Sequence, residues 1–206
     1  NEISSPKENG IYIKDSNVST VSNNKISAAG TRGISLFDSV IKKVCSNTIT
    51  SPKQDGIYLS GKSKVTYIGE NAATKNVVVN SGANGICLKK GSMATNIIGN
   101  EVKNSASANI RVEEIKKSSN ITQNMLSGSK KQGISIKDSQ VTLSGNKIKD
   151  TKTYGIYVEG KNCVCKINKN VVEKVNSEGI RINQGTVTII QNQLKNIKGY
   201  AIKIAG

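Results

Sequence analysis

The chain has 206 residues, of which 30 are Lys or Arg and 14 are Asp or Glu, and it contains no His. This excess of positive charge favours a polyanionic partner such as an acidic glycan, a cell-wall polymer or a nucleic acid. The four Cys form neither a CxxC pair nor a zinc pattern, and no apolar run approaches the roughly 18 residues of a membrane-spanning helix, so zinc modules and membrane spans are excluded.

A motif that begins Asn-x-apolar recurs along the whole sequence, at spacings of 22 to 24 residues with one longer gap of 29. The alternation of an apolar residue with its polar neighbours predicts a short strand at each occurrence. The repeated Asn residues are Asn1, Asn24, Asn47, Asn76, Asn100, Asn124, Asn146, Asn170 and Asn192. The apolar residues are Ile3, Ile26, Ile49, Val78, Val102, Leu126, Ile148, Val172 and Leu194.

A second strand is predicted where a Gly is followed by Ile-x-apolar, nine residues after each Asn. The Gly position holds Gly10, Gly33, Gly56, Gly85, Asn109, Gly133, Gly155, Gly179 and Ala201, and Ile follows in all nine cases. A third apolar position stands three residues before each later Asn and predicts a third strand: Val21, Val44, Ala73, Ile97, Ile121, Leu143, Ile167 and Ile189. Each repeat is therefore expected to contain three strands.

A repeat of about 23 residues with three short strands predicts a solenoid of about nine coils, in which three parallel sheets stack at roughly 4.8 Å per coil. Helical repeats would show long stretches of 3.6-residue periodicity, and the Leu-x-x-Leu-x-Leu frame of leucine-rich repeats is absent. The repeated Asn is expected to lie in a left-handed bend and to form a hydrogen-bonded ladder. The repeated Gly indicates either a positive φ or a close approach between coils.

From Asn1 to Ile204 these coils resemble the right-handed parallel β-helix of the pectate-lyase-like superfamily. The resemblance implies an all-β, single-stranded right-handed β-helix, which we expect to form one domain over residues 1–206 and to be a fragment of a longer protein. Lyases, polygalacturonases, epimerases, tailspikes, adhesin passengers and non-catalytic surface modules share this coil. It fits the polygalacturonase motifs poorly, because the required His and Asp pair are missing, and hydrolysis by paired carboxylates is therefore excluded.

The central residue of the Gly-Ile-x-apolar strand is predicted to point outward in every coil. This row reads Tyr12, Ser35, Tyr58, Cys87, Arg111, Ser135, Tyr157, Arg181 and Lys203. Sugar rings could rest on Tyr58 and Tyr157, and Arg111 and Arg181 could hold carboxylates through two parallel hydrogen bonds. Alternatively the face is an ordinary sheet surface, since Lys89, Glu113, Lys137 and Glu159 alternate in sign as a charge-compensating ladder would. Cys87 is expected to be exposed and reactive.

Lysines accumulate between the first and second strands of the repeat, and stacking is expected to gather them along one edge. They are Lys53, Lys103, Lys130, Lys131, Lys149, Lys152, Lys174, Lys195 and Lys198, of which Lys130, Lys131, Lys149 and Lys152 are the predicted binding residues. Such an edge either binds an extended anion or serves solubility and discourages edge-to-edge aggregation.

We interpret the chain as a non-catalytic bacterial module, secreted or at the cell surface, that binds acidic polysaccharide or another polyanion, as a monomer and without a cofactor. The alternative is a polysaccharide lyase or epimerase of the same fold, with Arg111, Glu113 and Glu114 as catalytic candidates and Ca²⁺ as a possible cofactor. A structural stalk is a further alternative. Nucleic acid is disfavoured because aromatic residues are only 3% of the chain. The longest coil, with extra residues within 60–75, is expected to wall one end of a groove.

Overall fold

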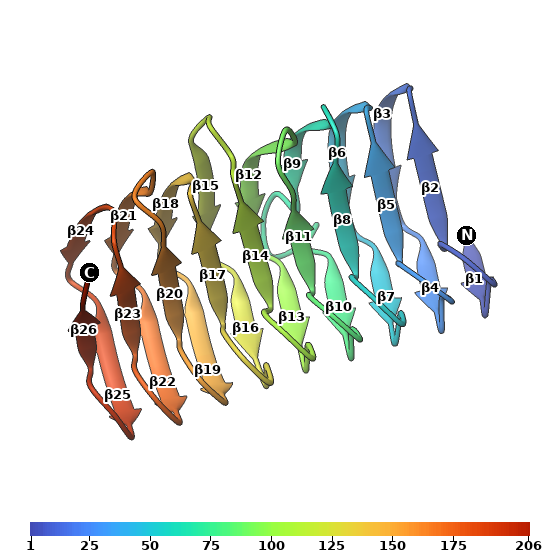
Figure 1. The fold of residues 1–206 in the computed structure, drawn as a ribbon. Coiled ribbons are helices and arrows are strands. Elements are labelled where there is room, and N and C mark those ends of the chain that lie inside the picture. The colour runs from blue at the N-terminus through green and yellow to red at the C-terminus, as the bar shows by residue number, and fades with distance from the viewer.

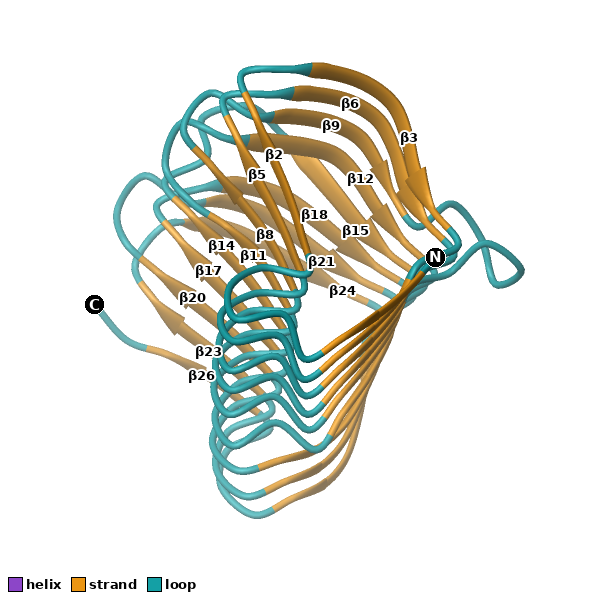
Figure 2. Ribbon diagram, turned by 90° about the vertical axis from the view of Figure 1, so that its right-hand side faces the viewer, coloured by secondary structure: helices purple, strands orange, loops and turns teal.

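The computed structural model describes all 206 residues and shows 26 strands arranged in three parallel sheets of nine, nine and eight strands. Successive strands belong to successive sheets, so the chain winds as a solenoid from β1 at the N-terminus to β26 near the C-terminus (Figure 1). Figure 2 shows the sheets enclosing a common interior. No helix able to cross a membrane is present.

We name the sheets A, B and C in the order in which the chain enters them. Sheet A contains β1 (Glu2–Ser4), β4 (Lys25–Ser27), β7 (Thr48–Thr50), β10 (Val77–Val79), β13 (Glu101–Lys103), β16 (Met125–Ser127), β19 (Lys147–Thr151), β22 (Val171–Val175) and β25 (Gln193–Ile197). Sheet B contains β2 (Ile11–Lys14), β5 (Ile34–Phe37), β8 (Ile57–Ser60), β11 (Ile86–Leu88), β14 (Ile110–Glu113), β17 (Ile134–Lys137), β20 (Ile156–Glu159), β23 (Ile180–Asn183) and β26 (Ile202–Ile204). Sheet C contains β3 (Asn17–Ser22), β6 (Val40–Cys45), β9 (Lys64–Ile68), β12 (Met93–Ile98), β15 (Ser119–Thr122), β18 (Gln140–Ser144), β21 (Val164–Asn168) and β24 (Thr186–Ile190).

The number of coils is slightly smaller than the sequence predicts. Taking each repeated Asn as the start of a coil, the structure has eight complete coils and a ninth that contributes only β25 and β26. Within the stack, equivalent residues of the repeat pair in register, as Ile110 does with Ile134 and Ile134 with Ile156. The predicted parallel β-solenoid is therefore confirmed, with a ninth coil that lacks its sheet C strand.

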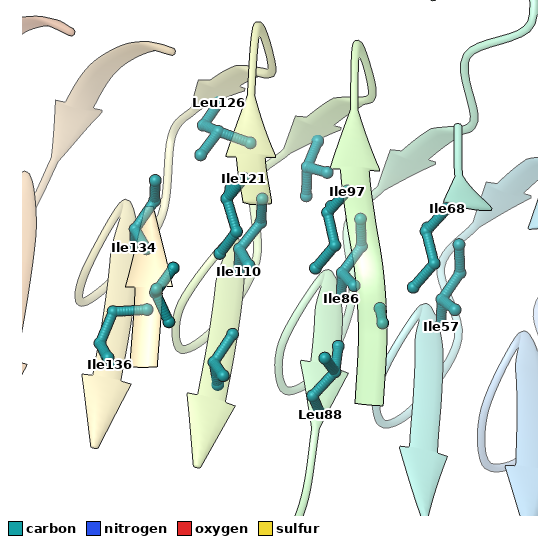
Figure 3. Close-up of a cluster of buried hydrophobic side chains, with 14 of the residues drawn as sticks. Ile57, Ile68, Ile86, Leu88, Ile97, Ile110, Ile121, Leu126, Ile134 and Ile136 are labelled. Atoms are coloured by element: carbon teal, nitrogen blue, oxygen red, sulfur yellow. The ribbon is translucent and has the colours of Figure 1, made fainter. Parts of the chain in front are cut away.

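The interior is one continuous apolar core of 37 buried residues. It is formed by the repeated Ile of sheet B and the repeated apolar residues of sheets A and C, and Figure 3 shows examples from the middle of the stack. Most of them are Ile, Val or Leu, and a β-branched side chain packs well on a pleated surface that is fully covered. Because each coil is covered by the next, the centre of the stack is better shielded from water than its ends: Ile134 is 0% exposed and Ile204 is 70% exposed.

The repeated Asn residues form the predicted ladder at the corner between sheets C and A. Asn47 shows the pattern: its side-chain amide donates to Asn76 Oδ1 at 3.0 Å and to the carbonyl oxygens of Val21 and Cys45. The left-handed residue is the one before the Asn, for example Ser46 with φ of 56°, and not the Asn itself. That bend turns the Asn side chain inward, where every polar atom must find a protein partner.

The repeated Gly marks a close approach between coils and not a positive φ. A Cβ on Gly33 would lie 2.4 Å from Ile49 Cγ2 and 2.7 Å from the carbonyl oxygen of Gly56, both in the following coil. Asn109 in the fifth coil and Ala201 in the ninth stand at the same position.

The prediction for the third strand was wrong in one coil. Val44 pairs with Ile68 and Ile68 with Ile97, so Ile68 occupies the position assigned to Ala73. The insertion lies within residues 69–75, which form a loop at the corner between sheets C and A, and Figure 2 shows a loop projecting there. This corner lies opposite sheet B, so the loop does not wall a groove on the outer face of that sheet.

Candidate polyanion-binding surface

The outer face of sheet B carries the row of residues predicted from the sequence. Arg111, Ser135, Tyr157 and Arg181 follow one another in register in coils five to eight. Arg111 and Arg181 are therefore separated by three coil spacings, roughly 14 Å at the usual distance between strands. The small Ser135 lies low between Arg111 and Tyr157 and is 6% exposed. The predicted row is therefore present, and the longer side chains of Arg111 and Tyr157 lie on either side of the small Ser135.

Arg111 is held by Glu113 of the same strand. The Nε atom of Arg111 donates to Glu113 Oε2 at 3.1 Å, and the Lys89 ammonium lies 2.6 Å from the same oxygen. Partial burial opposes ionisation of Glu113, but the hydrogen bond from Lys89 and the charge of Arg111 outweigh it and lower the pKa of that carboxyl. Two positive groups thus share one carboxylate, which leaves the cluster with one net positive charge.

Glu114 does not join Arg111 and Glu113. It has a left-handed conformation with φ of 54°, which turns the chain out of β14, and its carboxylate lies 3.1 Å from the ammonium of Lys90 at the corner between sheets B and C. No group of three or more His, Cys, Asp or Glu side chains is placed to hold a metal ion. The three proposed catalytic residues are therefore not assembled into one site, and they do not fit a Ca²⁺ ion.

Arg181 is the centre of a second cluster. Its Nε atom donates to Asn183 Oδ1 at 2.6 Å, and the Asn183 amide donates to the Tyr157 hydroxyl at 3.0 Å. A terminal nitrogen of Arg181 lies 3.6 Å from Glu178 Oε1, and the Lys203 ammonium lies at the same distance from that oxygen. Tyr157 also stacks on Tyr154, with ring centroids 5.1 Å apart. Arg181 and Tyr157 are thus linked through Asn183 and held in place.

Sequence reasoning missed Tyr154 and Glu178 because they precede the repeated Gly and were not assigned to the outer face. Asp55 occupies the same position in coil three, four coils before Tyr154 and five before Glu178, and is buried like Glu178. Their place in the repeat could have identified Tyr154 and Glu178, because the residue before the repeated Gly lies next to the first outward side chain of the strand that follows. The residue before the Gly therefore adds a third row to the outer face, beside the central residue of the strand and the residue two positions after it.

Tyr58 is less open to a sugar ring than predicted. The guanidinium of Arg32 lies 3.9 Å from the centroid of the Tyr58 ring, so one face of the ring is covered by a cation–π contact. Arg32 Nε is in turn 3.5 Å from Asp55 Oδ2, while Asp55 Oδ1 accepts hydrogen bonds from the backbone and side-chain amides of Asn84. This end of the face is occupied by contacts within the protein.

Cys87 is buried, and the prediction that it is exposed and reactive was wrong. It is 0% exposed although its position in the strand faces outward, and the longer residues Tyr58 and Arg111 flank it in the neighbouring strands. Burial, together with the negative charge of Asp55, raises the pKa of the Cys87 thiol to about 12. The thiolate, which is the reactive form, is therefore disfavoured at neutral pH.

The predicted lysine edge lies at the corner between sheets A and B. Lys130 and Lys152 occupy equivalent positions in coils six and seven, since their backbone amides donate to Ser105 and Ser129 in the coils before them. Lys131, Lys149 and these two are all exposed, and none takes part in any ion pair of the structure. Residues 153–155 connect this edge directly to β20, so the edge borders the outer face of sheet B.

Comparison with known proteins agrees with this architecture. A family model described as "right handed beta helix region" matches residues 1–73 and 65–206. The chain belongs to this family. It is accordingly a right-handed parallel β-helix, as the sequence predicted. No curated protein matched in a sequence comparison.

Two solved structures show how widely the fold is shared. The periplasmic alginate epimerase AlgG has a TM-score of 0.63 and 15% identity over 89% of this chain and 50% of its own. The A-module of the Azotobacter vinelandii mannuronan C-5 epimerase AlgE4 has a TM-score of 0.71 and 13% identity over 96% of this chain and 62% of its own. At these identities the likeness shows the fold alone, and the β-helix spans about half the length of the AlgG chain.

Proposed function

We propose that this β-helix is a non-catalytic module that binds an acidic, uronate-containing polysaccharide on the outer face of sheet B and the lysine edge beside it. The observation that carries the proposal is the set of exposed lysines without ion-pair partners, Lys130, Lys131, Lys149 and Lys152, next to the row of Arg111, Tyr157 and Arg181. We place the module outside the cytoplasm, secreted or at the cell surface, and acting as a monomer.

An extended polyanion suits this surface because the surface itself repeats. Charged positions recur at the spacing of the coils, and this spacing of roughly 4.8 Å is shorter than the Debye length of about 8 Å at physiological salt. They repel one another unless an anion lies along them. A flexible polysaccharide with one carboxylate on each sugar can supply such a row of charges, whereas a compact protein surface would supply only a few.

The Arg–Tyr row adds the means to recognise a sugar acid. A guanidinium can hold a carboxylate through two parallel hydrogen bonds, which the ammonium of Lys cannot do. Arg111 and Arg181 each use Nε for an internal contact, and Tyr157, which is stacked on Tyr154, presents a fixed ring between them. The names of AlgG and AlgE4, an alginate and a mannuronan epimerase, supply independent support for this class of glycan.

The same two names favour a second candidate, an epimerase or lyase that acts on such a glycan. That activity needs a base that can take the proton next to the uronate carboxylate. Glu113 is held by Lys89 and Arg111 with its pKa lowered, and burial together with Glu159 raises the pKa of Tyr157, which keeps that phenol protonated. Neither change produces a base poised near neutral pH, so we rank binding above catalysis.

The proposal is tested by calorimetric titration of the chain with polygalacturonate, alginate and a neutral glucan at low and physiological salt. We expect both acidic polymers to bind, the neutral one not to bind, and affinity to fall steeply as salt rises. Absence of binding to both acidic polymers at low salt would refute the proposal. Incorporation of solvent deuterium into the polymer, or absorbance from unsaturated uronate, would instead establish the catalytic alternative.

A double variant of the two arginines distinguishes specific recognition of carboxylates from binding by net positive charge alone. Replacing Arg111 and Arg181 by Lys preserves the total charge but removes the paired hydrogen bonds, so affinity for a uronate oligomer is expected to fall at least tenfold. The matched control is Arg32→Lys, because Arg32 is already engaged with Tyr58 and Asp55. Equal affinity of the wild type and the double variant would remove the two arginines from the site.

A further inference from the structure

A groove of about 870 Å³ lies on the opposite side of sheet B, at the corner between sheets B and C. The turns that leave sheet B in coils four to seven form it, together with Lys64 at the start of β9 in coil three. Four lysines line the groove, Lys64, Lys90, Lys116 and Lys117. None of these residues belongs to the surface described above.

The groove lies where a longer turn is followed by a shorter one, because the turn of coil five has two residues more than the turn of coil six. The backbone amide of Ile115 donates to Ser139 Oγ, and Ser119 pairs with Val141, so residues 116–118 of coil five occupy the place of Gln140 alone in coil six. The longer turn of coil five bulges outward, and Lys116 and Lys117 are exposed on it. In coil four the turn has the same length as in coil five, and it is closed by a hydrogen bond from Ser92 N to the Lys89 carbonyl at 3.0 Å. Residues of both turns line the groove.

The charges that face the groove are only partly balanced. Lys90 pairs with Glu114 at 3.1 Å, and Asp138 Oδ1 accepts hydrogen bonds from the backbone and side-chain amides of Asn162. The side chains of Lys64, Lys116, Lys117 and Gln140 make no hydrogen bond or ion pair in the structure and are exposed. Three ammonium groups and one amide are thus free to bind, and the groove carries a net charge of +2 from its four lysines and two acids.

The lining also indicates what kind of ligand fits. Only Met93 and Ile115 of the lining residues are hydrophobic, whereas pockets for apolar small molecules are lined mainly by hydrophobic and aromatic side chains. A volume in the upper part of the usual range for ligand pockets, together with an open and polar lining, suits a hydrated, anionic ligand of two or three sugar rings. A single inorganic anion would leave most of the groove empty.

We propose that this groove binds a short acidic saccharide, such as the end or a side branch of a glycan chain, through its carboxylate groups. The inference rests on the proposed function for the class of ligand, but it assigns a separate subsite. Lys116 and Lys117 supply the charge, the free amide of Gln140 can bond sugar hydroxyls, and the neutralised Lys90–Glu114 pair forms the wall towards sheet B.

The test is an NMR titration of the ¹⁵N-labelled full chain with trigalacturonate, with inorganic sulfate and maltotriose as comparison ligands. We expect trigalacturonate to shift the backbone amide signals of Gly91, Ser92 and Lys117, sulfate to shift them at least fivefold more weakly, and maltotriose to leave them unchanged. The double variant Lys116→Gln/Lys117→Gln should lower the affinity at these signals at least fivefold.

The matched control is Lys147→Gln/Lys169→Gln, which removes the same charge from exposed positions on sheet A and at the corner between sheets C and A. It should leave the groove signals unaffected. An equal loss of affinity in both double variants would show that net charge alone matters and would overturn the inference, as would equal affinity for sulfate and trigalacturonate. All four residues are exposed, and the dispersion of each spectrum confirms that the variant is folded.

The titration also separates this inference from the proposed function. Shifts confined to sheet B and the lysine edge would overturn the groove and support the proposed function. Shifts confined to the groove would support the inference and refute the binding surface assigned to sheet B. Absence of shifts in both places, with trigalacturonate at millimolar concentration and low salt, would overturn both.

Discussion

Replacing Asn124 by Ala is expected to be among the most destabilising single changes of a polar residue in this chain. The Asn124 side chain is 0% exposed and is used completely. Its amide donates to Asn146 Oδ1 at 2.9 Å and to the carbonyl oxygens of Ile97 and Thr122. Its Oδ1 accepts from the backbone amide of Asn100 at 2.9 Å and from the Asn100 side chain at 3.0 Å.

The expected loss of stability follows from the hydrogen bonds that each partner of Asn124 keeps after the substitution. The backbone N–H of Asn100 loses its hydrogen-bond acceptor in the buried corner, which costs about 1 to 3 kcal/mol. The Asn100 side chain keeps the carbonyl oxygen of Ile68, and Asn146 Oδ1 keeps the backbone amide of Asn124. Each of these partners loses one bond of about 1 kcal/mol net. We therefore expect the free energy of unfolding to fall by about 3 to 5 kcal/mol.

The matched control is Asn1→Ala at the exposed end of the same ladder. The side chain of Asn1 makes one hydrogen bond, to Asn24 Oδ1, and water can replace it. Its loss should change stability by less than about 0.5 kcal/mol. Urea denaturation followed by circular dichroism and by tyrosine fluorescence measures both variants and shows whether unfolding is two-state. A loss below 1 kcal/mol for Asn124→Ala, or equal losses for the two variants, would refute the argument.

Three further predictions concern the core, the lysine edge and the sheet B face. Ile134→Ala should lower the free energy of unfolding by about 2 to 5 kcal/mol in the same assay, because a void between two coils cannot collapse; a loss below half a kcal/mol would contradict its burial. Reversing Lys130, Lys131, Lys149 and Lys152 to Glu should abolish polygalacturonate binding in calorimetry with little change in melting temperature, whereas the same reversal at Lys42, Lys62, Lys166 and Lys169 should retain most of the binding. Glu113 has a lowered pKa when folded, so its ionisation stabilises the fold above the ordinary value of 4.5 and this contribution is lost as pH falls through the folded pKa. The stability difference between the wild type and Glu113→Gln should therefore shrink on acidification, and a difference independent of pH would show that the ion pairs contribute nothing.

The fold could be predicted from the sequence because the physics that sets it is periodic. Every coil must bury the same three apolar positions against its neighbours, so Ile110, Ile134 and Ile156 repeat the same residue for the same reason. The exception is informative: Ala73 fits the spacing counted back from Asn76, but Ile68 fills the interior position. An inserted loop changes the number of residues between the strand and the next Asn but leaves the packing unchanged. Spacing in the sequence alone does not tell whether the insertion precedes or follows the strand.

The sequence could predict which side chains point outward from sheet B, but not the contacts that these side chains make. Alternation correctly placed Arg111, Tyr157 and Arg181 on one face. Alternation did not show that Arg32 covers Tyr58, or that Cys87 is buried between longer neighbours, because both depend on side-chain length across adjacent coils. Neither could it separate Glu113 from Glu114, since the separation depends on one left-handed residue at the end of β14.

The distribution of acids decides which lysines can bind. With 30 basic and 14 acidic residues, charge alone would make almost any face of this solenoid a candidate. In the structure the acids neutralise particular lysines: Glu70 pairs with Lys43, Glu101 with Lys75 and Glu113 with Lys89. The exposed lysines that remain without partners include those of coils six and seven at the corner of sheets A and B, and Lys116 and Lys117 at the corner of sheets B and C. Sheet B is therefore flanked by free positive charge on both edges, whereas its centre carries the arginines with planar hydrogen-bonding groups. A ligand with negative charge along its whole length is the one that can use both kinds of group at once.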